Sequence, residues 1–144
     1  MKNSRSGITP TRAEGLRIFA VVPYSRLTTF KRDGSRASVP IWQAVGGDRI
    51  YMFTEAASWK VKRLRRDPRV ELTTCDWRGN TDGGPTWAGT GRVVEDKAAV
   101  ERAYDALEKK YGWQKWLTDV LSRISGRYNG RAIVEITLDE TAAA

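Results

Sequence analysis

The chain has 144 residues and a formal net charge of +8 at pH 7, with 25 lysine and arginine residues against 17 acidic ones. It contains no histidine and one cysteine, Cys75, which excludes an internal disulfide and Ser-His-Asp or Cys-His catalysis, and no metal site is expected. The length suits a single domain, and the positive charge predicts an anionic partner: a phosphate, a polyanionic cofactor, nucleic acid or acidic lipid. Any chemistry must then come from a bound cofactor or from carboxylate, tyrosine and lysine groups.

Residues 1–12 are polar and are expected to form a flexible tail before one domain over residues 13–140. Thr11 is followed three positions later by Glu14, a capping-box pattern that predicts a helix up to Ala20. No apolar run approaches the length that spans a bilayer, and no signal-peptide pattern begins the chain. We therefore expect a cytoplasmic protein with no membrane partner.

Three strands in meander order are predicted next. The first covers residues 24–31 and is followed by a hairpin turn centred on Asp33-Gly34. The second covers residues 37–45 and contains Pro40, which has to lie at an edge or a bulge. The third covers residues 49–54, after a glycine-rich turn.

The segment 58–68, SWKVKRLRRDP, holds the densest group of positive charges in the chain. It lies between predicted strands 49–54 and 70–76, and Ser58 marks the start of a helix. The bare N–H groups at a helix start attract an anion, whereas lysines in the first turn oppose the helix dipole. Helix stability alone does not explain these lysines, so the pattern indicates an anionic ligand.

The spacing within this helix separates two faces. Val61 and Leu64 share the face that is expected to dock on the sheet. The opposite arc carries the tryptophan and three cations: Trp59, Lys62, Arg63 and Arg66. That arc faces a ligand, another subunit or water, and a solvated basic face remains the alternative interpretation.

The second half of the chain predicts a glycine-rich loop over residues 77–85, a strand over 86–95, and a helix from Asp96 to Tyr111. A broad apolar helical pattern follows over residues 113–124, and a last strand covers 131–138. Mostly antiparallel strands with helical interruptions predict a small barrel with helical appendages. The apolar helix 113–124 is explained equally by a homodimer interface or by ordinary core packing.

Four segments of the chain resemble a known family. Arg26 to Lys31 (RLTTFK) occupies the place of a first-strand Arg-x-x-x-x-Lys pattern. Thr54, Ser58-Trp59-Lys60, Leu64 and Asp67-Pro68 follow a second motif of that family, and residues 39–42 and 74–79 match two of its strand ends. The chain resembles the pyridoxamine-phosphate-oxidase-like split β-barrel superfamily over residues 24–138. It is most similar to the deazaflavin (coenzyme F420)-dependent oxidoreductases, because Trp59 stands where flavin-binding members usually have a basic residue.

The resemblance implies an α+β, mainly β fold: a six-stranded antiparallel split β-barrel with flanking helices. It also implies hydride transfer between reduced F420 and a small electron-poor organic substrate, with FMN as the alternative cofactor. Ser58, Lys60, Lys62 and Arg63 would hold the phosphate and the acidic tail. The full set of implied cofactor-binding residues is Arg26, Thr28, Thr29, Lys31, Pro40, Ile41, Trp42, Thr54, Ser58, Trp59, Lys60, Lys62, Arg63 and Trp77.

No catalytic side chain is assigned, because the cofactor carries the chemistry. Water, Tyr24 or Tyr51 would supply the proton, and the sequence does not choose among them. A carrier without turnover and a nucleic-acid-binding module are the competing functions, since basic residues interleaved with tryptophan can also bind single strands. The charges concentrate near one helix and no nucleic-acid motif is present, which favours a cofactor and a small-molecule substrate in a homodimer.

Overall fold

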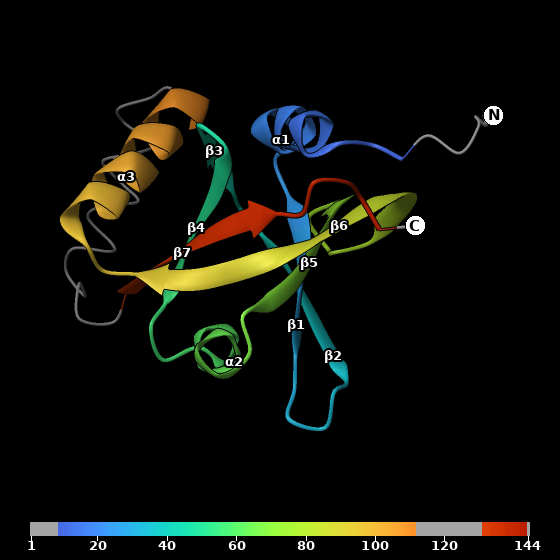
Figure 1. Cartoon of the computed structure of the whole chain (residues 1–144), viewed down its shortest axis with the longest axis horizontal. Coiled ribbons are helices and arrows are strands. Elements are labelled where there is room, and N and C mark those ends of the chain that lie inside the picture. The colour runs from blue at the N-terminus through green and yellow to red at the C-terminus, as the bar shows by residue number, and fades with distance from the viewer. Residues whose placement is uncertain (1–8, 112–130, 144) are drawn as a thin grey trace.

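The computed structural model describes residues 9–111 and 131–143, and its one sheet is flanked by helices (Figure 1). The helices are α1 (Arg12–Val21), α2 (Trp59–Arg66) and α3 (Lys97–Tyr111). The strands are β1 (Ser25–Phe30), β2 (Arg36–Ile41), β3 (Ala44–Gly46), β4 (Arg49–Glu55), β5 (Arg69–Cys75), β6 (Thr81–Val94) and β7 (Arg131–Leu138). The predicted α+β, mainly β class is confirmed, whereas the predicted number of six strands is wrong, because the described residues form seven.

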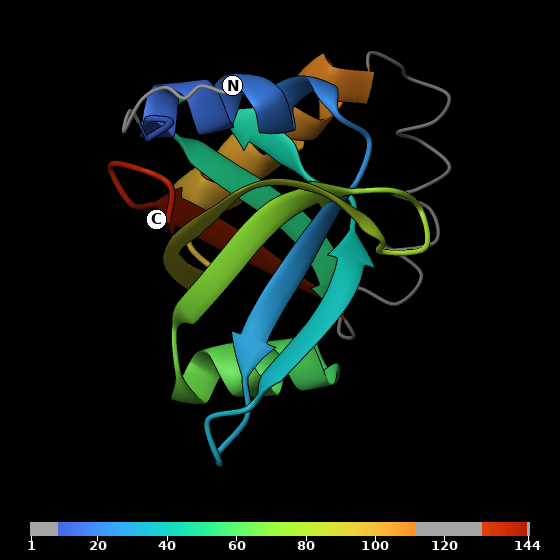
Figure 2. The same cartoon turned by 90° about the vertical axis from the view of Figure 1, so that its right-hand side faces the viewer.

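The sheet closes into a split barrel because its two edge strands are consecutive in the chain. Its order is β2-β1-β5-β6-β7-β4-β3, and all neighbours are antiparallel. Residues 42–43 alone join edge strand β2 to edge strand β3. Such a link spans only about 10 Å, so the sheet has to curl until its edges approach each other. Figure 2 shows β1 and β2 in front of β4 and β7.

The same link explains the additional strand. The sequence predicts one strand over 37–45, but Gln43 is fully buried and interrupts it. Its Nε2 donates to the carbonyl oxygens of Phe19 (3.0 Å) and Val22 (2.9 Å) at the end of α1. Lys110 Nζ donates to the Gln43 carbonyl (2.7 Å) and to the same two α1 carbonyls. The chain therefore leaves β2, is fastened between two helices, and resumes as β3 at the other edge.

The barrel interior and the α3 interface are built from alternate residues of the same strands. In β4, Ile50 and Met52 belong to the interior cluster, whereas Tyr51 belongs to the cluster beneath α3. This follows from the two-residue period of a strand. On α3, alanines and Leu107 form the buried face against the sheet. The predicted helix from Asp96 is confirmed, and Asp96 Oδ2 accepts from the Ala99 N–H (3.1 Å).

The predicted capping box of α1 is present. Thr11 Oγ1 accepts from the Glu14 N–H (3.2 Å), and Glu14 Oε1 accepts from the Thr11 N–H (2.9 Å). The next residue, Gly15, packs against Trp87. A Cβ at this position would lie 2.7 Å from the indole, so only glycine lets α1 approach it this closely. Residues 1–8 of the expected tail lie outside the described residues, and Arg12 already belongs to the helix.

The remaining predictions differ at their boundaries. The loop expected over 77–85 is shorter, because Asp76 Oδ1 accepts the N–H groups of Arg78 (2.8 Å) and Asn80 (2.9 Å) and β6 begins at Thr81. The strand predicted over 131–138 is confirmed as β7. The apolar helix predicted over 113–124 lies outside the described residues. Within the part of the chain that the structure describes, no helix has the length and apolar character needed to cross a membrane.

Candidate cofactor site

Helix α2 presents a basic stripe because its apolar pair faces the sheet. Ser58 caps the helix, its Oγ accepting from the Val61 N–H (3.4 Å). Val61 and Leu64 are 1% and 4% exposed, so both predicted docking residues are buried. The opposite side carries residues 59, 62, 63 and 66, one helical turn apart in pairs.

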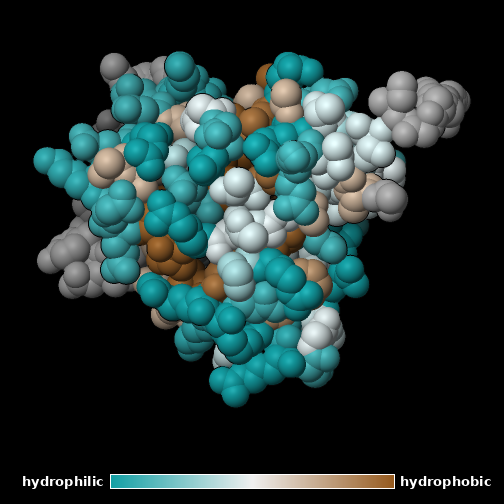
Figure 3. Space-filling model, viewed as in Figure 1, coloured by the Kyte–Doolittle hydropathy of each residue, from teal (hydrophilic) through white to brown (hydrophobic). Residues whose placement is uncertain are grey.

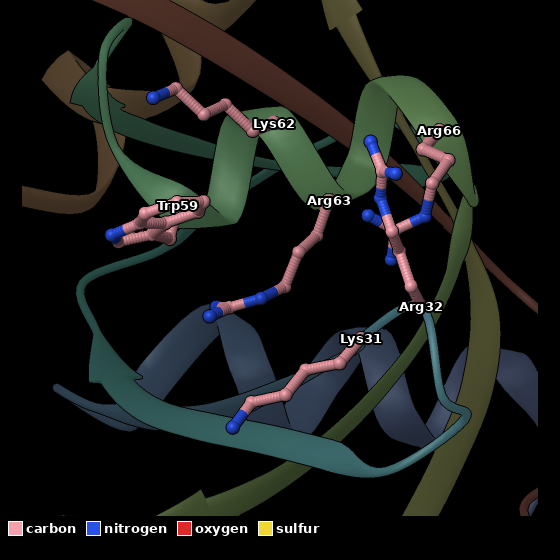
Figure 4. A pocket seen from close by; sticks show the side chains of 6 residues that line it. All are labelled: Lys31, Arg32, Trp59, Lys62, Arg63 and Arg66. Atoms are coloured by element: carbon pink, nitrogen blue, oxygen red, sulfur yellow. The ribbon is translucent and has the colours of Figure 1, made fainter.

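This stripe forms one wall of a pocket of about 410 Å³, and the β1–β2 hairpin forms the other (Figure 4). Its lining residues, which we call the basic groove, are Lys31, Arg32, Trp59, Lys62, Arg63 and Arg66. Arg63 from α2 and Lys31 from the end of β1 extend from opposite walls into the space between them (Figure 4). The surface at this end of the molecule is mostly hydrophilic (Figure 3).

The groove is held in place by contacts among its own residues. Lys62 Nζ lies 4.6 Å and Arg63 Cζ 5.9 Å from the centroid of the Trp59 ring, distances typical of cation–π contacts. Arg66 donates to the Phe30 carbonyl (2.6 Å) and fastens α2 to the end of β1. Trp59 is 68% exposed, so the indole holds cations at the surface and does not fill the core.

Two cations near the groove, Arg36 and Arg69, are paired with carboxylates, whereas the cations of the groove have no such partner among the described residues. Arg36 makes a two-bond contact with Glu71 (3.2 and 3.1 Å), and Arg69 pairs with Asp67 at 2.7 Å. Hydrogen bonds from Arg69 lower the pKa of Asp67 to about 2. Among the described residues, no carboxylate lies within 4.0 Å of the five cations of the groove. The groove therefore brings together five positive charges, of which Lys31 and Arg66 act on the carboxylates of Asp33 and Asp67 only from beyond 4.0 Å.

Comparison with known families identifies the fold. Residues 16–143 match a family model described as pyridoxamine 5'-phosphate oxidase. The chain belongs to this family. The match covers the whole barrel and both walls of the basic groove.

Solved structures agree with this assignment. A conserved hypothetical protein, Rv2991 from Mycobacterium tuberculosis, is 26% identical with a TM-score of 0.71, covering 97% of this chain and 88% of that one. The heme storage protein HutZ from Vibrio cholerae is 8% identical with a TM-score of 0.68, and covers 94% of both chains. An FAD-binding protein from Mesorhizobium loti is 17% identical with a TM-score of 0.59, covering 94% and 93%. The last two similarities concern the fold alone. None of the curated proteins compared with the chain matches it.

In this pyridoxamine 5'-phosphate oxidase family member, the structure brings four of the predicted cofactor residues together in the groove. These are Lys31, Trp59, Lys62 and Arg63. Two further lining residues, Arg32 and Arg66, were absent from the predicted set. Arg66 lies on the predicted basic arc, and its angular position was the signal that could have found it. Arg32 was assigned to a turn, and no local pattern indicates that this turn faces α2.

The other predicted residues lie outside the groove. Thr28 and Thr29 are buried in β1, and Thr28 Oγ1 lies 2.7 Å from Ser38 Oγ on β2. Ile41 is 8% exposed and packs in the barrel core. The remaining ones outside the groove are Arg26, Pro40, Trp42, Thr54, Ser58, Lys60 and Trp77. Their contact with a cofactor stays a prediction.

Two of these predicted residues, Trp42 and Trp77, are exposed aromatic groups near the end of β2. They are 49% and 64% exposed. The turn that carries Trp77 packs on β2, since a Cβ at Gly79 would lie 3.4 Å from Pro40. Arg78 stacks on Trp77 with Cζ 4.7 Å from the ring centroid.

Of the two predicted tyrosine proton donors, Tyr51 has an evident structural role. Its hydroxyl donates to Glu135 (2.8 Å), whose carboxylate also accepts from Arg92 (3.0 Å). Burial raises the pKa of Tyr51 above its ordinary value. The side chain is fully buried beneath α3, which assigns it to packing and to this ion network. No cluster of metal-ligating side chains occurs within residues 9–111 and 131–143.

Proposed function

We propose that the protein is an F420-dependent oxidoreductase that transfers a hydride between reduced deazaflavin and a small electron-poor organic molecule. The observation that carries the proposal is the basic groove, in which five cations have no carboxylate partner within 4.0 Å among the described residues. Such a site favours a ligand with several negative groups.

The amount of charge favours F420 over FMN. A phosphate monoester carries about −1.5 to −2 at neutral pH, which leaves most of the five cations uncompensated. F420 carries a phosphate and a tail of carboxylates, so its charges extend over a longer path. The groove spans two elements, α2 and the β1–β2 turn, and presents cations along both. FMN remains the alternative cofactor. Its phosphate would make the same contacts, but it has no tail of carboxylates to pair with the remaining cations.

In this proposal, one group of residues binds the anionic tail of the cofactor and another orients its ring. Lys62, Arg63 and Lys31 bind the anionic tail, and the exposed aromatic groups at the end of β2 orient the ring. When bound, the deazaflavin supplies the hydride. The protein fixes the distance between the ring and the substrate and lowers the entropy cost of their encounter.

Nucleic acid is a weaker alternative because of how Trp59 is used. Single-strand binding relies on an aromatic face that is open to a base. Lys62 and Arg63 already lie against the Trp59 ring. A base would have to displace these cations before it could stack.

Fluorescence titration with oxidised F420, run in parallel with FMN at low and high salt, tests the proposal. We expect F420 to bind more tightly than FMN and to lose more affinity as salt rises, because it makes more ionic contacts. Tighter binding of FMN with little salt dependence would contradict it. No binding of either cofactor, with steep salt-dependent binding of single-stranded DNA, would favour the nucleic-acid interpretation.

The proposed assembly is a homodimer. Trp42, Trp59 and Trp77 are 49%, 68% and 64% exposed, more aromatic surface than one small domain usually leaves open. Light scattering after gel filtration gives the mass directly, and a mass near that of one 16.2 kDa chain would contradict the proposal.

A further inference from the structure

A second pocket, of about 650 Å³, lies where the C-terminal end of α1 faces the β5–β6 hairpin. We call it the hairpin pocket. Its walls come from residues 18–23 of α1 and the following loop, and from residues 74–85 of the hairpin. The volume lies within the range of about 300–1,000 Å³ that small-molecule sites occupy. It shares no lining residue with the basic groove.

The apolar part of the hairpin pocket is well fixed. Ile18 of α1, Val22 just after it and Pro85 of β6 line the pocket, and the lining residue Trp87 has no exposed surface. The Trp87 indole N–H donates to the Thr11 carbonyl (3.2 Å), and its ring contacts Phe19 edge-on at 5.5 Å. The indole is therefore a rigid support beneath the pocket, and the aliphatic side chains provide the contact surface.

The charge of this pocket is opposite to that of the molecule. The chain carries a net charge of +8, yet the described residues that line the pocket include two aspartates and no lysine or arginine. Hydrogen bonds from the N–H groups of Asn80 and Arg78 lower the pKa of Asp76, so its carboxylate is ionised at neutral pH. Arg78, the cation of this turn, stacks on Trp77 and is not a lining residue, although its charge also helps to lower the pKa of Asp76.

The second aspartate, Asp82, is an exposed residue of β6. Asp82 Oδ1 accepts from the Gly84 N–H (2.9 Å) and from Thr74 Oγ1 (3.4 Å), which fixes the carboxylate. All hydrogen bonds of Asp82 to described residues use Oδ1. Oδ2 can therefore accept from a ligand without any loss to the hairpin.

We propose that the hairpin pocket binds a small organic cation, an ammonium or guanidinium group attached to an apolar body. The cationic group pairs with Asp82, and Asp76 adds to the negative potential. The apolar body lies against Ile18, Val22 and Pro85. Anions of the same shape should bind more weakly, because two carboxylates repel them and the lining residues that the structure describes include no cation.

Three ligands of one shape test this preference: benzylamine, benzyl alcohol and benzoate. Each is titrated at pH 7 into the ¹⁵N-labelled full chain, and amide shifts locate the binding. The variant is Asp82→Asn, which keeps the Oδ1 acceptor and removes the charge. Asp105→Asn, an exposed carboxylate on α3, is the matched control. Thr81→Lys, which places a cation at the rim, is a second variant. No cofactor is present, so the outcome is independent of the F420 proposal.

We expect benzylamine to shift the amides of residues 74–84 and to bind more tightly than benzyl alcohol, with benzoate giving no shifts there. Asp82→Asn should weaken benzylamine binding by about two- to fivefold, Asp105→Asn should leave it unchanged, and Thr81→Lys should abolish it. The proposal is overturned if benzoate shifts the same amides as strongly, if benzylamine shifts only other amides, or if both pocket variants bind benzylamine as the native chain does.

Discussion

The basic groove and the hairpin pocket lie at opposite ends of β1 and differ in how their charges are held. Lys31 follows the last residue of β1 and lines the groove, whereas residues 22–23 precede its first residue and line the pocket. In the groove no described carboxylate lies within 4.0 Å of the cations, and in the pocket the aspartates are fixed by backbone N–H groups. The two proposals therefore assign a flexible polyanion to one end of the barrel and a compact cation to the other.

The largest expected effect concerns the support beneath the hairpin pocket. Gly15→Ala places a methyl group 2.7 Å from Trp87 and should lower the free energy of unfolding by about 1–3 kcal/mol. Ala13→Ser, at an exposed position of the same helix, should change it by less than about 0.5 kcal/mol. Denaturant titration measures both. Benzylamine binding should fall in Gly15→Ala while F420 affinity stays the same. An equal loss at both sites would show that the two ends are not independent.

The next prediction tests whether F420 binding depends on the cations of the groove or only on the net charge of the protein. Lys62→Ala with Arg63→Ala should weaken F420 binding about tenfold or more, because two charge-assisted contacts are lost. The difference should shrink at high salt. Lys97→Ala with Lys109→Ala removes the same charge from exposed positions of α3 and should have little effect. Equal losses in the two double variants would mean that net charge, and not the groove, attracts the cofactor.

The smallest expected effect tests the negative potential of the hairpin pocket. Burial, and then the charge of Asp76, raises the pKa of the Cys75 thiol. Since the thiolate is the nucleophile, alkylation by iodoacetamide at pH 8 should be slower than for free N-acetylcysteine, with its midpoint at higher pH. Asp76→Asn should move that midpoint toward lower pH. Mass spectrometry follows the rate, and an unchanged midpoint in Asp76→Asn would show that burial alone sets the reactivity.

Local signals predicted much of this architecture. The capping box at Thr11, the Asp33-Gly34 turn and the two faces of α2 each depend on neighbours within one turn, and each is present. The prediction of one continuous strand over 37–45 was wrong. The strand is interrupted because Gln43 hydrogen-bonds to α1, which lies twenty or more residues earlier in the chain. A two-residue period says nothing about which edge of a sheet a strand joins.

The site was predictable to the extent that it lies on one element. The arc of α2 follows from helical geometry, so Trp59, Lys62 and Arg63 were found together. Arg32 enters the groove only because the β1–β2 hairpin folds against α2. The hairpin pocket was not predicted at all, since residues 18–23 and 74–85 meet through the packing of α1 on Trp87.

The hydrogen bonds of Gln43 to α1 also determine where a foreign peptide can be inserted. Two donor atoms, Gln43 Nε2 and Lys110 Nζ, make four hydrogen bonds to the carbonyls at the end of α1, at the point where the sheet closes. A peptide tag inserted at residues 42–43 would separate these donors from their acceptors and open the barrel. The same tag between Asp33 and Ser35 would lengthen an exposed turn and leave closure intact. For keeping the barrel closed, the hairpin tip is therefore a better insertion point than residues 42–43, although Lys31 and Arg32 of the basic groove adjoin it.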